Sequence, residues 1–514
     1  MNSGRLFVWF YLSLLAKTSL ALDGVPDSSF AINGNLRFLL GDENYGNTIG
    51  ICPDQSIVTS GSYFYDSLST IRIVYFSKHL PDGSPDITFG QNGILDSVFV
   101  GHYAGISKLK ILPGGKILAI GSNGSGILLR LNANGTVDSA FGTNGVANIR
   151  TSAGLDFQSN GKIIASGAYF DGFHTFFCVE RCFPDGSPDS SFATNGFSTA
   201  DISPERFDIN YAIKVQSDDK ILLAGVTYST GSDERTLLVR YNANGSLDSA
   251  FGISGVVTTP VGNAPGYGRF SDVDIQSDGK IVVAGEAQYA PGNRTGSLVV
   301  RYNADGTLDN TFGTNGITIE SHATNGNSSF NAVQVLPNGE IIAAGTTGLG
   351  FWTIQSYTTC MRFNSAGILD TNFANNGIFL SNMFNAVTNT AYDLIAGANG
   401  KIYLIGIASD TNTSNQKGVA VICLKDNSAV GIEEDIQISP NRIYPNPARD
   451  EFVIDNISEN STVEIYNLIG QQIKIENNSI GNNKIRIRLR VSAGVYFVRI
   501  GDGRTKWTQK LVVY

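Results

Sequence analysis

The sequence predicts an all-β protein, with a seven-bladed β-propeller followed by a small C-terminal β-sandwich. Three observations predict this fold. One phrase recurs seven times, each repeat contains strand-like stretches joined by turn motifs, and the last part of the chain lacks the phrase. A repeat of roughly fifty to sixty residues is typical of a stacked or circular array of similar units, not of independent domains.

The repeated phrase is clearest over Asn244–Gly252, where an Asn-Gly turn is followed by an aspartate and a Phe-Gly pair. We expect its phenylalanine to lie between adjacent units and to bury about 150–200 Å². It recurs as Phe30, Phe89, Phe141, Phe192, Phe251, Phe312 and Phe373.

Each repeat contains four strand-like stretches. The Asp278-Gly279 pair predicts a tight hairpin turn of two residues with positive φ. Ile281–Ala284 is continuously apolar, which is typical of a strand covered on both faces. Four short antiparallel strands in each of seven units favour a propeller over the alternative, a β-solenoid. In the fifth repeat the stretches are Gly255–Thr259, Val273–Gln276, Lys280–Gly285 and Ser297–Tyr302.

The repeat resembles the delta-60 repeat family over roughly residues 22–425. The motifs that carry the resemblance are Gln276–Ile281 with Ala284-Gly285, Val300–Asn303, and Asp305–Asp309 with Phe312-Gly313. The resemblance implies a β-propeller of the kind found mostly in bacterial surface or secreted proteins. It implies no activity.

The N-terminus has the layout of a secretory signal peptide. The apolar run Leu6–Ala16 follows Arg5, and Ser19-Leu20-Ala21 has small residues at its first and third positions. We therefore expect residues 1–21 to be a signal peptide cleaved near Ala21. The run is too short for a permanent anchor, and no later segment reaches membrane-spanning length, so we expect no membrane span in the mature chain.

The sequence predicts that the C-terminal segment is a separate domain. The two prolines of Tyr444–Pro447 indicate a boundary. Lys484–Arg490 alternates strictly between charged and apolar residues, as a half-buried strand of a sandwich does. We expect residues 426–441 to be a linker and residues 442–514 to be the β-sandwich.

Several motifs of this segment occur in an order that resembles the type A C-terminal sorting domain of type IX secretion substrates. The motifs are Tyr444–Pro447, Val463–Asn467 with Gly470, Ala493–Val498 and Lys510–Val513. The resemblance implies a Bacteroidetes-type source, the type IX secretion machinery as a partner, and a location outside the cell or on its surface.

The composition narrows the range of functions. The net charge is −9 and the pI about 5.1, so the basic footprint of a nucleic-acid-binding protein is absent. The four histidines lack metal-ligand spacing, and neither a nucleophile elbow nor a phosphate-binding glycine loop occurs. We therefore predict no catalytic residue, metal or cofactor. The five scattered cysteines are typical of small buried side chains.

A basic residue and a carboxylate recur in the repeats, for example Arg240 with Asp248 and Arg301 with Asp309. A ring of arginines is one way to bind an anionic glycan. Alternatively, each arginine pairs with its aspartate and ties a strand to its turn. Recurrence in nearly every unit favours the structural pairing.

We expect a secreted or cell-surface propeller that acts as a binding or scaffold module, and we favour this over an enzyme. A glycan or protein ligand is expected at loops that vary between repeats and carry Tyr289, Phe351, Trp352 and Tyr357. The alternative is an extracellular polysaccharide hydrolase or lyase with its site on the propeller axis. A cluster of non-repeated Asp, Glu, His or Tyr on the axis would favour that alternative.

Overall fold

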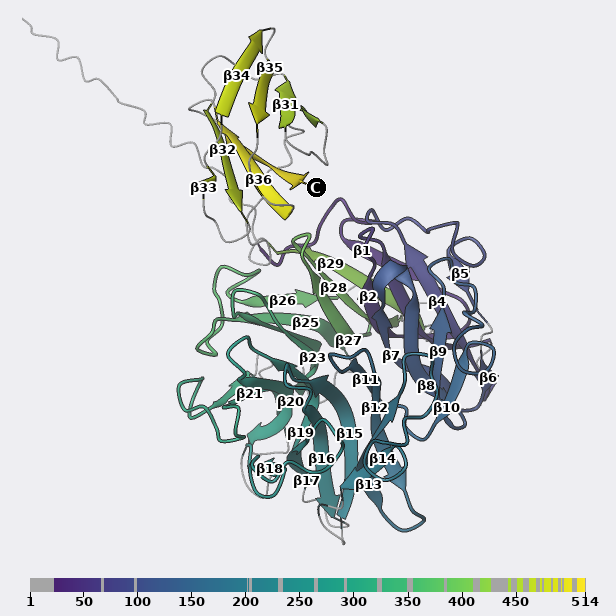
Figure 1. The fold of residues 1–514 in the computed structure, drawn as a ribbon. Coiled ribbons are helices and arrows are strands. Elements are labelled where there is room, and N and C mark those ends of the chain that lie inside the picture. Colours follow the sequence, from purple (N-terminus) through teal and green to yellow (C-terminus); the bar gives the residue numbers. More distant parts are fainter. Residues whose placement is uncertain are drawn as a thin grey trace, which may run out of the picture. The chain divides into compact units, whose positions relative to one another are not determined.

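A computed structural model gives the fold (Figure 1). The chain forms two compact units, Met1–Gly431 and Ile432–Tyr514, which are described separately. The structure describes residues 23–65, 69–96, 99–200, 202, 206–229, 234–262, 267–290, 294–320, 326–348, 355–382, 386–409, 417–426, 442–444, 451–455, 462–467, 472–473, 476–481, 484–488, 491, 494–501 and 506–513. The predicted signal peptide and linker lie outside these residues, apart from Asp426.

Five separate four-stranded antiparallel sheets make up most of the first unit. The first two contain β7 (Ala104–Ile111), β8 (Ile117–Asn123), β9 (Gly126–Leu131) and β10 (Val146–Ile149), then β11 (Gly154–Phe157), β12 (Ile163–Phe170), β13 (Thr175–Cys182) and β14 (Phe197–Ala200). The next two contain β15 (Arg206–Val215), β16 (Ile221–Ser229), β17 (Glu234–Tyr241) and β18 (Val256–Thr259), then β19 (Gly268–Ile275), β20 (Ile281–Ala290), β21 (Arg294–Tyr302) and β22 (Ile317–Glu320). The fifth contains β23 (Ser328–Val335), β24 (Ile341–Gly348), β25 (Ser356–Phe363) and β26 (Ile378–Ser381).

The first and last repeats share one nine-stranded sheet. The prediction of seven separate blades therefore differs from the structure, in which five sheets are separate. The physical reason is a single parallel pair, Glu43 with Lys417, which joins β2 to β29. The strands are β27 (Thr388–Gly397), β28 (Lys401–Ser409), β29 (Lys417–Lys425), β2 (Glu43–Ile51), β3 (Ile57–Phe64), β4 (Arg72–His79) and β5 (Ile94–Leu95), with β1 (Asn35–Phe38) on β29 and β6 (Val100–Gly101) on β4.

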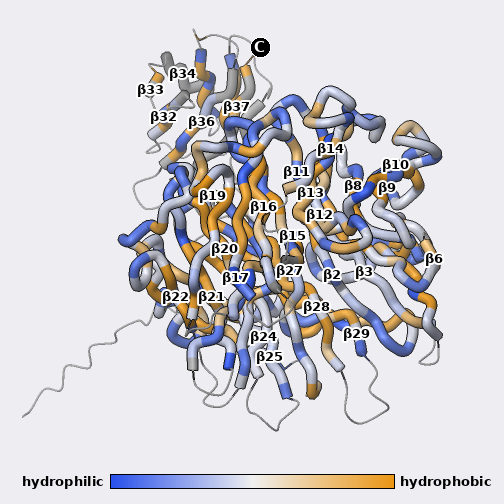
Figure 2. The backbone as a smooth tube through the Cα atoms, turned by 90° about the horizontal axis from the view of Figure 1, so that it is seen from below, coloured by the Kyte–Doolittle hydropathy of each residue, from blue (hydrophilic) through white to orange (hydrophobic). Residues whose placement is uncertain are grey.

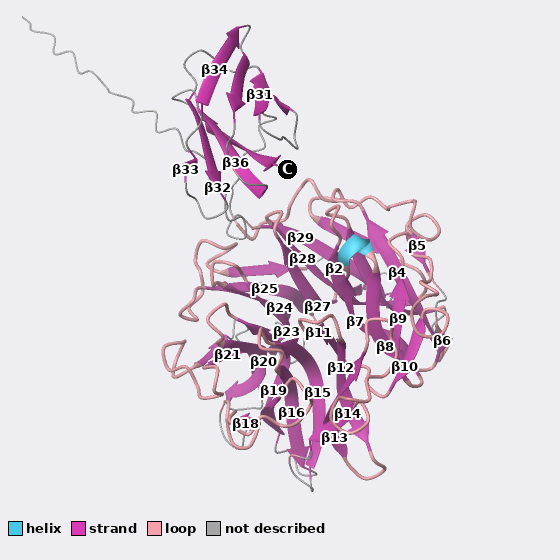
Figure 3. Ribbon diagram, in the orientation of Figure 1, coloured by secondary structure: helices cyan, strands magenta, loops and turns pink. Residues whose placement is uncertain are grey.

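In the five separate sheets of the first unit, the second strand is buried on both faces over its first five residues, as the apolar runs predict. In β20, Ile281, Val282, Val283 and Ala284 are all 0% exposed. Figure 2 shows hydrophobic stretches following the strands and hydrophilic ones gathering in the connections. Strand dominates Figure 3, and the helix described is the short 3-10 turn η1 (Pro113–Gly115).

The hairpin turns are longer than the predicted two-residue turns. The turn between β19 and β20 closes with the N–H of Gln276 donating to the carbonyl of Lys280, and Gly279 has a φ of 85°. The N–H of Gly279 also donates to the carbonyl of Gln276, as in a three-residue loop built from a type I turn and one following residue with positive φ, so one such residue is enough. In the fourth repeat Asp219 takes this position with a φ of 64°, a conformation that Asp tolerates.

The sheets are offset from the sequence repeats by one strand. The strand that follows each phrase was expected to begin a new unit, but it forms the outer edge of the preceding sheet. β18, which follows Phe251, pairs with β17. By the same rule β1, which follows Phe30, pairs with β29 at the far end of the repeat array. The N-terminal strand therefore completes the last sheet.

The repeated phenylalanines lie at the junctions between repeats. All seven are 0% exposed. A methyl group at Gly306, in the turn of the next repeat, would lie 2.9 Å from the ring of Phe251. The residue after each phenylalanine donates its backbone N–H to a turn carbonyl of the following repeat. After the last phenylalanine, Ala374 donates to the carbonyl of Asp23, so the last repeat is hydrogen-bonded to the start of the array. These contacts form a closed ring, and the fold of this unit is a β-propeller.

The second unit contains two four-stranded sheets. Apolar side chains of both sheets, including Phe452, Ile487, Ile465 and Val498, belong to one hydrophobic cluster. The sheets contain β30 (Arg442–Tyr444), β31 (Glu451–Asp455), β35 (Lys484–Arg488) and β34 (Glu476–Gly481), and β33 (Gln472–Ile473), β32 (Thr462–Asn467), β36 (Gly494–Gly501) and β37 (Lys506–Val513).

Candidate functional site

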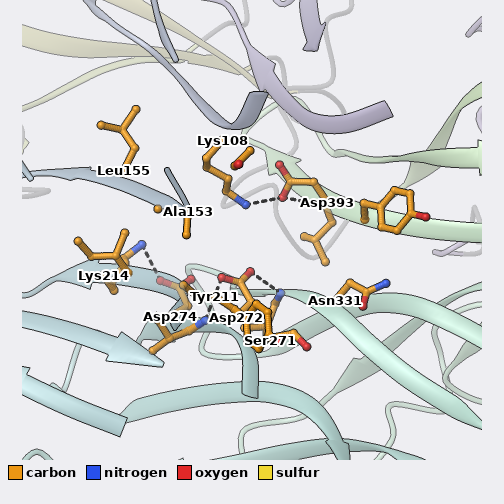
Figure 4. Close-up of a pocket in the computed structure, with 18 of the residues that line it drawn as sticks. Lys108, Ala153, Leu155, Tyr211, Lys214, Ser271, Asp272, Asp274, Asn331 and Asp393 are labelled. Carbon is orange, nitrogen blue, oxygen red and sulfur yellow. Dashed lines mark hydrogen bonds and ion pairs between the residues drawn. The ribbon is translucent and has the colours of Figure 1, made fainter. Parts of the chain in front are cut away.

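In each repeat, the strand that comes before the buried apolar strand is called here the first strand. The first strands surround a cavity of about 340 Å³, called here the axial pocket (Figure 4). Residues of β2, β7, β11, β15, β19, β23 and β27 line it. Its polar lining residues are Asn47, Ser107, Lys108, Lys110, Tyr211, Lys214, Ser271, Asp272, Asp274, Asn331, Gln334, Tyr392 and Asp393.

A β-bulge occurs at the same place in six of these strands. In β15, for example, the pairing register shifts between Asn210 and Ala212, so Tyr211 is the extra residue. A bulge redirects a side chain out of the regular ladder, and all six bulge residues line the pocket. They differ in type between repeats: Asn47, Ser107, Tyr211, Ser271, Asn331 and Tyr392.

Three ion pairs connect the walls of the pocket. Nζ of Lys108 lies 2.7 Å from Asp393, and Nζ of Lys214 lies 2.7 Å from Asp274. Lys110 lies 3.4 Å from Asp156. Figure 4 shows Lys108 and Lys214 on different walls, each directed toward its carboxylate.

Two of these carboxylates, and Asp272 as well, accept backbone N–H groups from neighbouring first strands. Asp156 accepts from Val215, at 2.8 Å. Asp272 and Asp274 accept from Val333 and Val335, at 2.9 and 2.8 Å. These strands belong to different sheets, so the carboxylates help to join sheets that no ladder connects.

Burial and charge shift the pKa values of this site. Burial raises the pKa of Asp272, and this effect outweighs the opposite influence of Lys108. Burial alone would lower the pKa of Lys108, but Asp393 and Asp272 raise it overall. Burial also raises the pKa of the Tyr211 and Tyr392 hydroxyls. The lysine therefore stays charged, while Asp272 favours its protonated form more than an exposed aspartate does.

A polar cluster adjoins the pocket at Tyr211. The guanidinium of Arg269 lies 6.0 Å from the Tyr211 ring and 2.7 Å from Glu286. The hydroxyl of Tyr267 donates to Glu286 at 3.1 Å. Burial raises the pKa of Glu234, and Glu286 raises it further while Arg269 lowers it.

Aromatic side chains continue from this cluster. Phe207 stacks on Tyr228 with ring centroids 5.5 Å apart, and His174 lies 6.2 Å from Phe207. Phe207 precedes Tyr211 by four residues on β15, which is roughly 13 Å along an extended strand. Phe173, beside His174 in the connection between β12 and β13, is 79% exposed. We call Phe173, His174, Phe207 and Tyr228 the aromatic ledge.

The residues predicted from the variable loops fall elsewhere. Tyr289 lies on β20 and Tyr357 on β25, and neither is among the described residues that line the axial pocket. Phe351 and Trp352 lie outside the described residues. A ligand site at these four residues stays a prediction.

The repeated arginines lie at the junctions between repeats. Nε of Arg240 donates to Asp248 at 2.8 Å, and Nε of Arg301 donates to Asp309 at the same distance. Five arginines stack over the repeated phenylalanines, with guanidinium-to-centroid distances of 4.3 to 5.0 Å: Arg130, Arg181, Arg240, Arg301 and Arg362. This geometry suits a structural role, which we keep as a proposal.

Sequence reasoning missed the axial residues because they do not recur. Lys108 and Asp272 occupy equivalent positions in different repeats, directly after the bulge. The other bulged strands have Thr48, Ala212, Ala332 and Asp393 at this position, so a charged residue that appears there in only some repeats is the signal that points to them.

Two absences hold for the described residues. No group of three or more His, Cys, Asp or Glu side chains is arranged to hold a metal ion. Within the same part of the chain, none of the helices has the length and apolar character needed to cross a membrane. All five cysteines are buried and unpaired, as expected.

The fold and the C-terminal segment together define an exported β-propeller protein. Residues 442–514 match the secretion system C-terminal sorting domain. Residues 110–141, 216–251 and 276–312 match a β-propeller family described as a domain of unknown function, DUF5122. The sorting domain is of the type IX kind, so the chain is exported by that system to the outer cell surface or the medium. The resemblance to the delta-60 repeat family is not confirmed by name, because the matching family is described as DUF5122.

The chain is also similar to several solved structures, at low TM-scores and low sequence identity. A polysaccharide lyase, Uly1, has a TM-score of 0.44 at 9% identity, covering 79% of this chain and 96% of the lyase. A fungal alcohol oxidase of the AA5 family, in complex with copper, has a TM-score of 0.41 at 11% identity, covering 93% and 98%. PorZ, a surface component of the type IX secretion system of Porphyromonas gingivalis, has a TM-score of 0.21 at 11% identity, covering 94% and 74%. At these scores the likenesses carry no argument about function. No curated protein matches the chain.

Proposed function

We propose that the protein is an exported carbohydrate-binding propeller whose axial pocket receives one sugar of a glycan. The observation that carries the proposal is a polar cavity of about 340 Å³ whose lining side chains change from repeat to repeat. A scaffold needs equivalent residues in equivalent places, whereas a binding site needs a few differing groups that converge. The aromatic ledge supports the same function, because sugar rings stack on aromatic faces.

The architecture that we propose is a seven-bladed propeller with a C-terminal sandwich. Counting the nine-stranded sheet as two blades joined by one parallel pair gives one blade for each phenylalanine. The shared hydrophobic cluster of the last two sheets supports a sandwich. We further propose a signal peptide at residues 1–21, a linker at 426–441 and a source among Bacteroidetes.

The experiment is a binding screen of the mature protein against soluble polysaccharides and oligosaccharides by titration calorimetry. We expect at least one glycan to bind, and Tyr211→Ala to weaken it by about tenfold, because Tyr211 lies in the pocket and on the same strand as Phe207 of the aromatic ledge. Tyr103→Ala is the matched control, since Tyr103 is 78% exposed and is not among the described pocket residues. Binding that Tyr211→Ala leaves intact would place the site elsewhere.

One observation favours the second candidate, a polysaccharide hydrolase or lyase. Asp272 and Asp393 are carboxylates on the axis that follow the bulges of β19 and β27 and are absent from the other bulged strands, and the raised pKa of Asp272 suits a proton donor. The same screen distinguishes the two functions. New reducing or unsaturated ends that disappear in Asp272→Asn would establish an enzyme, and binding without product would establish a binding module.

A further inference from the structure

The axial pocket exposes three lysine ammonium groups to a ligand, whereas the carboxylates that pair with them are more buried. The side chains of Lys108, Lys110 and Lys214 are 34%, 35% and 34% exposed. Their partners Asp393 and Asp274 are 4% and 13% exposed. The surface that a ligand meets is therefore richer in ammonium groups than the residue count suggests.

The carboxylates have little capacity left for a ligand. Asp393 accepts from the hydroxyl of Thr48 at 2.9 Å and from the N–H of Ile49 at 3.2 Å, besides its pair with Lys108. Asp274 accepts from Val335 besides its pair with Lys214. An ammonium group has three N–H donors, and each of these ion pairs uses one of them.

The remaining carboxylate does not reverse this balance. Both oxygens of Asp272 accept backbone N–H groups, from Val273 and Val333 at 2.9 Å each. Burial raises the pKa of this half-buried side chain, so three ammonium groups face three carboxylates paired with them and one further carboxylate whose oxygens are already hydrogen-bonded. A hydrogen bond in which the donor or the acceptor is ionised is about twice as strong as one between two neutral groups, and a carboxylate adds Coulomb attraction to the ammonium groups.

Two tyrosines line the pocket at equivalent positions of two first strands. Tyr211 and Tyr392 are bulge residues of β15 and β27. These strands are three steps apart in the ring of seven first strands, which is the largest separation that the ring allows. A flat hydroxylated ring between them would have aromatic surface on both sides.

We infer that the axial pocket selects an anionic saccharide, with the carboxylate of a uronic acid residue bound by Lys108, Lys110 and Lys214. The inference rests on the proposed carbohydrate-binding function and specifies its ligand class. The chain on either side of the bound residue leaves along the aromatic ledge. The polymer is thus an acidic polysaccharide.

The test compares two probes of equal length on the mature protein, a hexamer of galacturonic acid and the same hexamer with methyl-esterified carboxyl groups. We expect the acid form to bind at least about tenfold more tightly, and its affinity to fall as salt rises. Lys110→Met and the double variant Lys108→Met/Asp393→Asn are both expected to remove about tenfold or more of this affinity. The double variant removes a whole ion pair, so it leaves no buried charge that would unfold the protein.

Lys162→Met is the matched control. Lys162 pairs with Asp189 at 2.8 Å and is 23% exposed, but it is not among the described residues of the pocket. Equal binding of both probes, or a preference for the ester, would overturn the inference and leave carbohydrate binding intact. Failure of both hexamers while another neutral glycan binds would also overturn it. Failure of every glycan would overturn both this inference and the proposed function.

Discussion

Single residues decide how this protein responds to acid. His79 lies in β4 and is only 5% exposed, with its ring 3.1 Å from the hydroxyl of Ser77 and 5.5 Å from the Phe38 ring. Burial lowers the pKa of His79 from 6.5 to about 4. Between those two pH values the unfolded chain binds a proton at this position that the folded chain does not.

The contribution of His79 to the unfolding free energy should therefore fall as the pH drops from 6.5 to 4. The size of the shift corresponds to a loss of about 3 kcal/mol. Urea unfolding at several pH values measures it, and His79→Gln should flatten the slope in this window. His102→Gln, at an exposed histidine, should leave the slope unchanged. Asp189 and Asp309, whose hydrogen bonds to neighbouring residues lower their pKa despite burial, act only below about pH 4, the ordinary range for aspartate.

At the scale of elements, the turns determine how closely neighbouring repeats pack. Gly279 and Gly306 both have positive φ, at 85° and 90°. A methyl group at Gly279 would meet only Ala304, at 3.8 Å, whereas one at Gly306 would lie 2.9 Å from both Phe251 and Val257. The two glycines therefore share a backbone conformation and differ in the space around them.

We expect Gly279→Ala to lower the unfolding free energy by about 1–2 kcal/mol, the cost of a left-handed alanine. Gly306→Ala should cost about 1–3 kcal/mol more, because Phe251 must shift within a packed junction. Chemical denaturation of the two variants measures the difference. Equal losses would show that the phenylalanine does not fill the junction between the repeats.

The elements were predictable wherever the signal is local. Turn motifs and apolar runs identified the strands around Asp278-Gly279, and the phrase identified each phenylalanine. The pairing of β18 with β17 was not predictable, because the sequence does not say which neighbouring sheet a strand after the phrase will join. The axial pocket was not predictable either, since Lys108 and Asp393 are distant in sequence and meet only when the ring closes.

At the scale of the propeller, one arginine joins its two ends. The other stacked arginines each donate to a backbone carbonyl of the next repeat, but Arg362 donates to the carboxylates of Asp426 and Asp23, at 2.7 and 3.0 Å. Arg362 is 2% exposed and Asp426 is fully buried. Next to this cluster, Gly24 donates its backbone N–H to Lys425.

Arg362→Met should lower the unfolding free energy by about 3–5 kcal/mol, because it leaves a buried carboxylate without its cation. Arg130→Met is the matched control from the middle of the array. Its partner Asp138 keeps a second cation, Lys116, at 2.7 Å, so the loss should be smaller. Calorimetry of both variants measures the difference. A larger loss for Arg130→Met would contradict the special role of Arg362 in joining the two ends.

The position of β1 also has a consequence for biosynthesis. Its partner on β29 is made almost four hundred residues later, as in the pair Asn35 with Ile422. Because β1 is synthesised long before β29, the two strands cannot pair while most of the chain is being made. Until β29 has been made and the propeller has closed, the backbone N–H and C=O groups of β1 lack their partner strand. In that interval the chain is open to proteases and to mispairing with other strands.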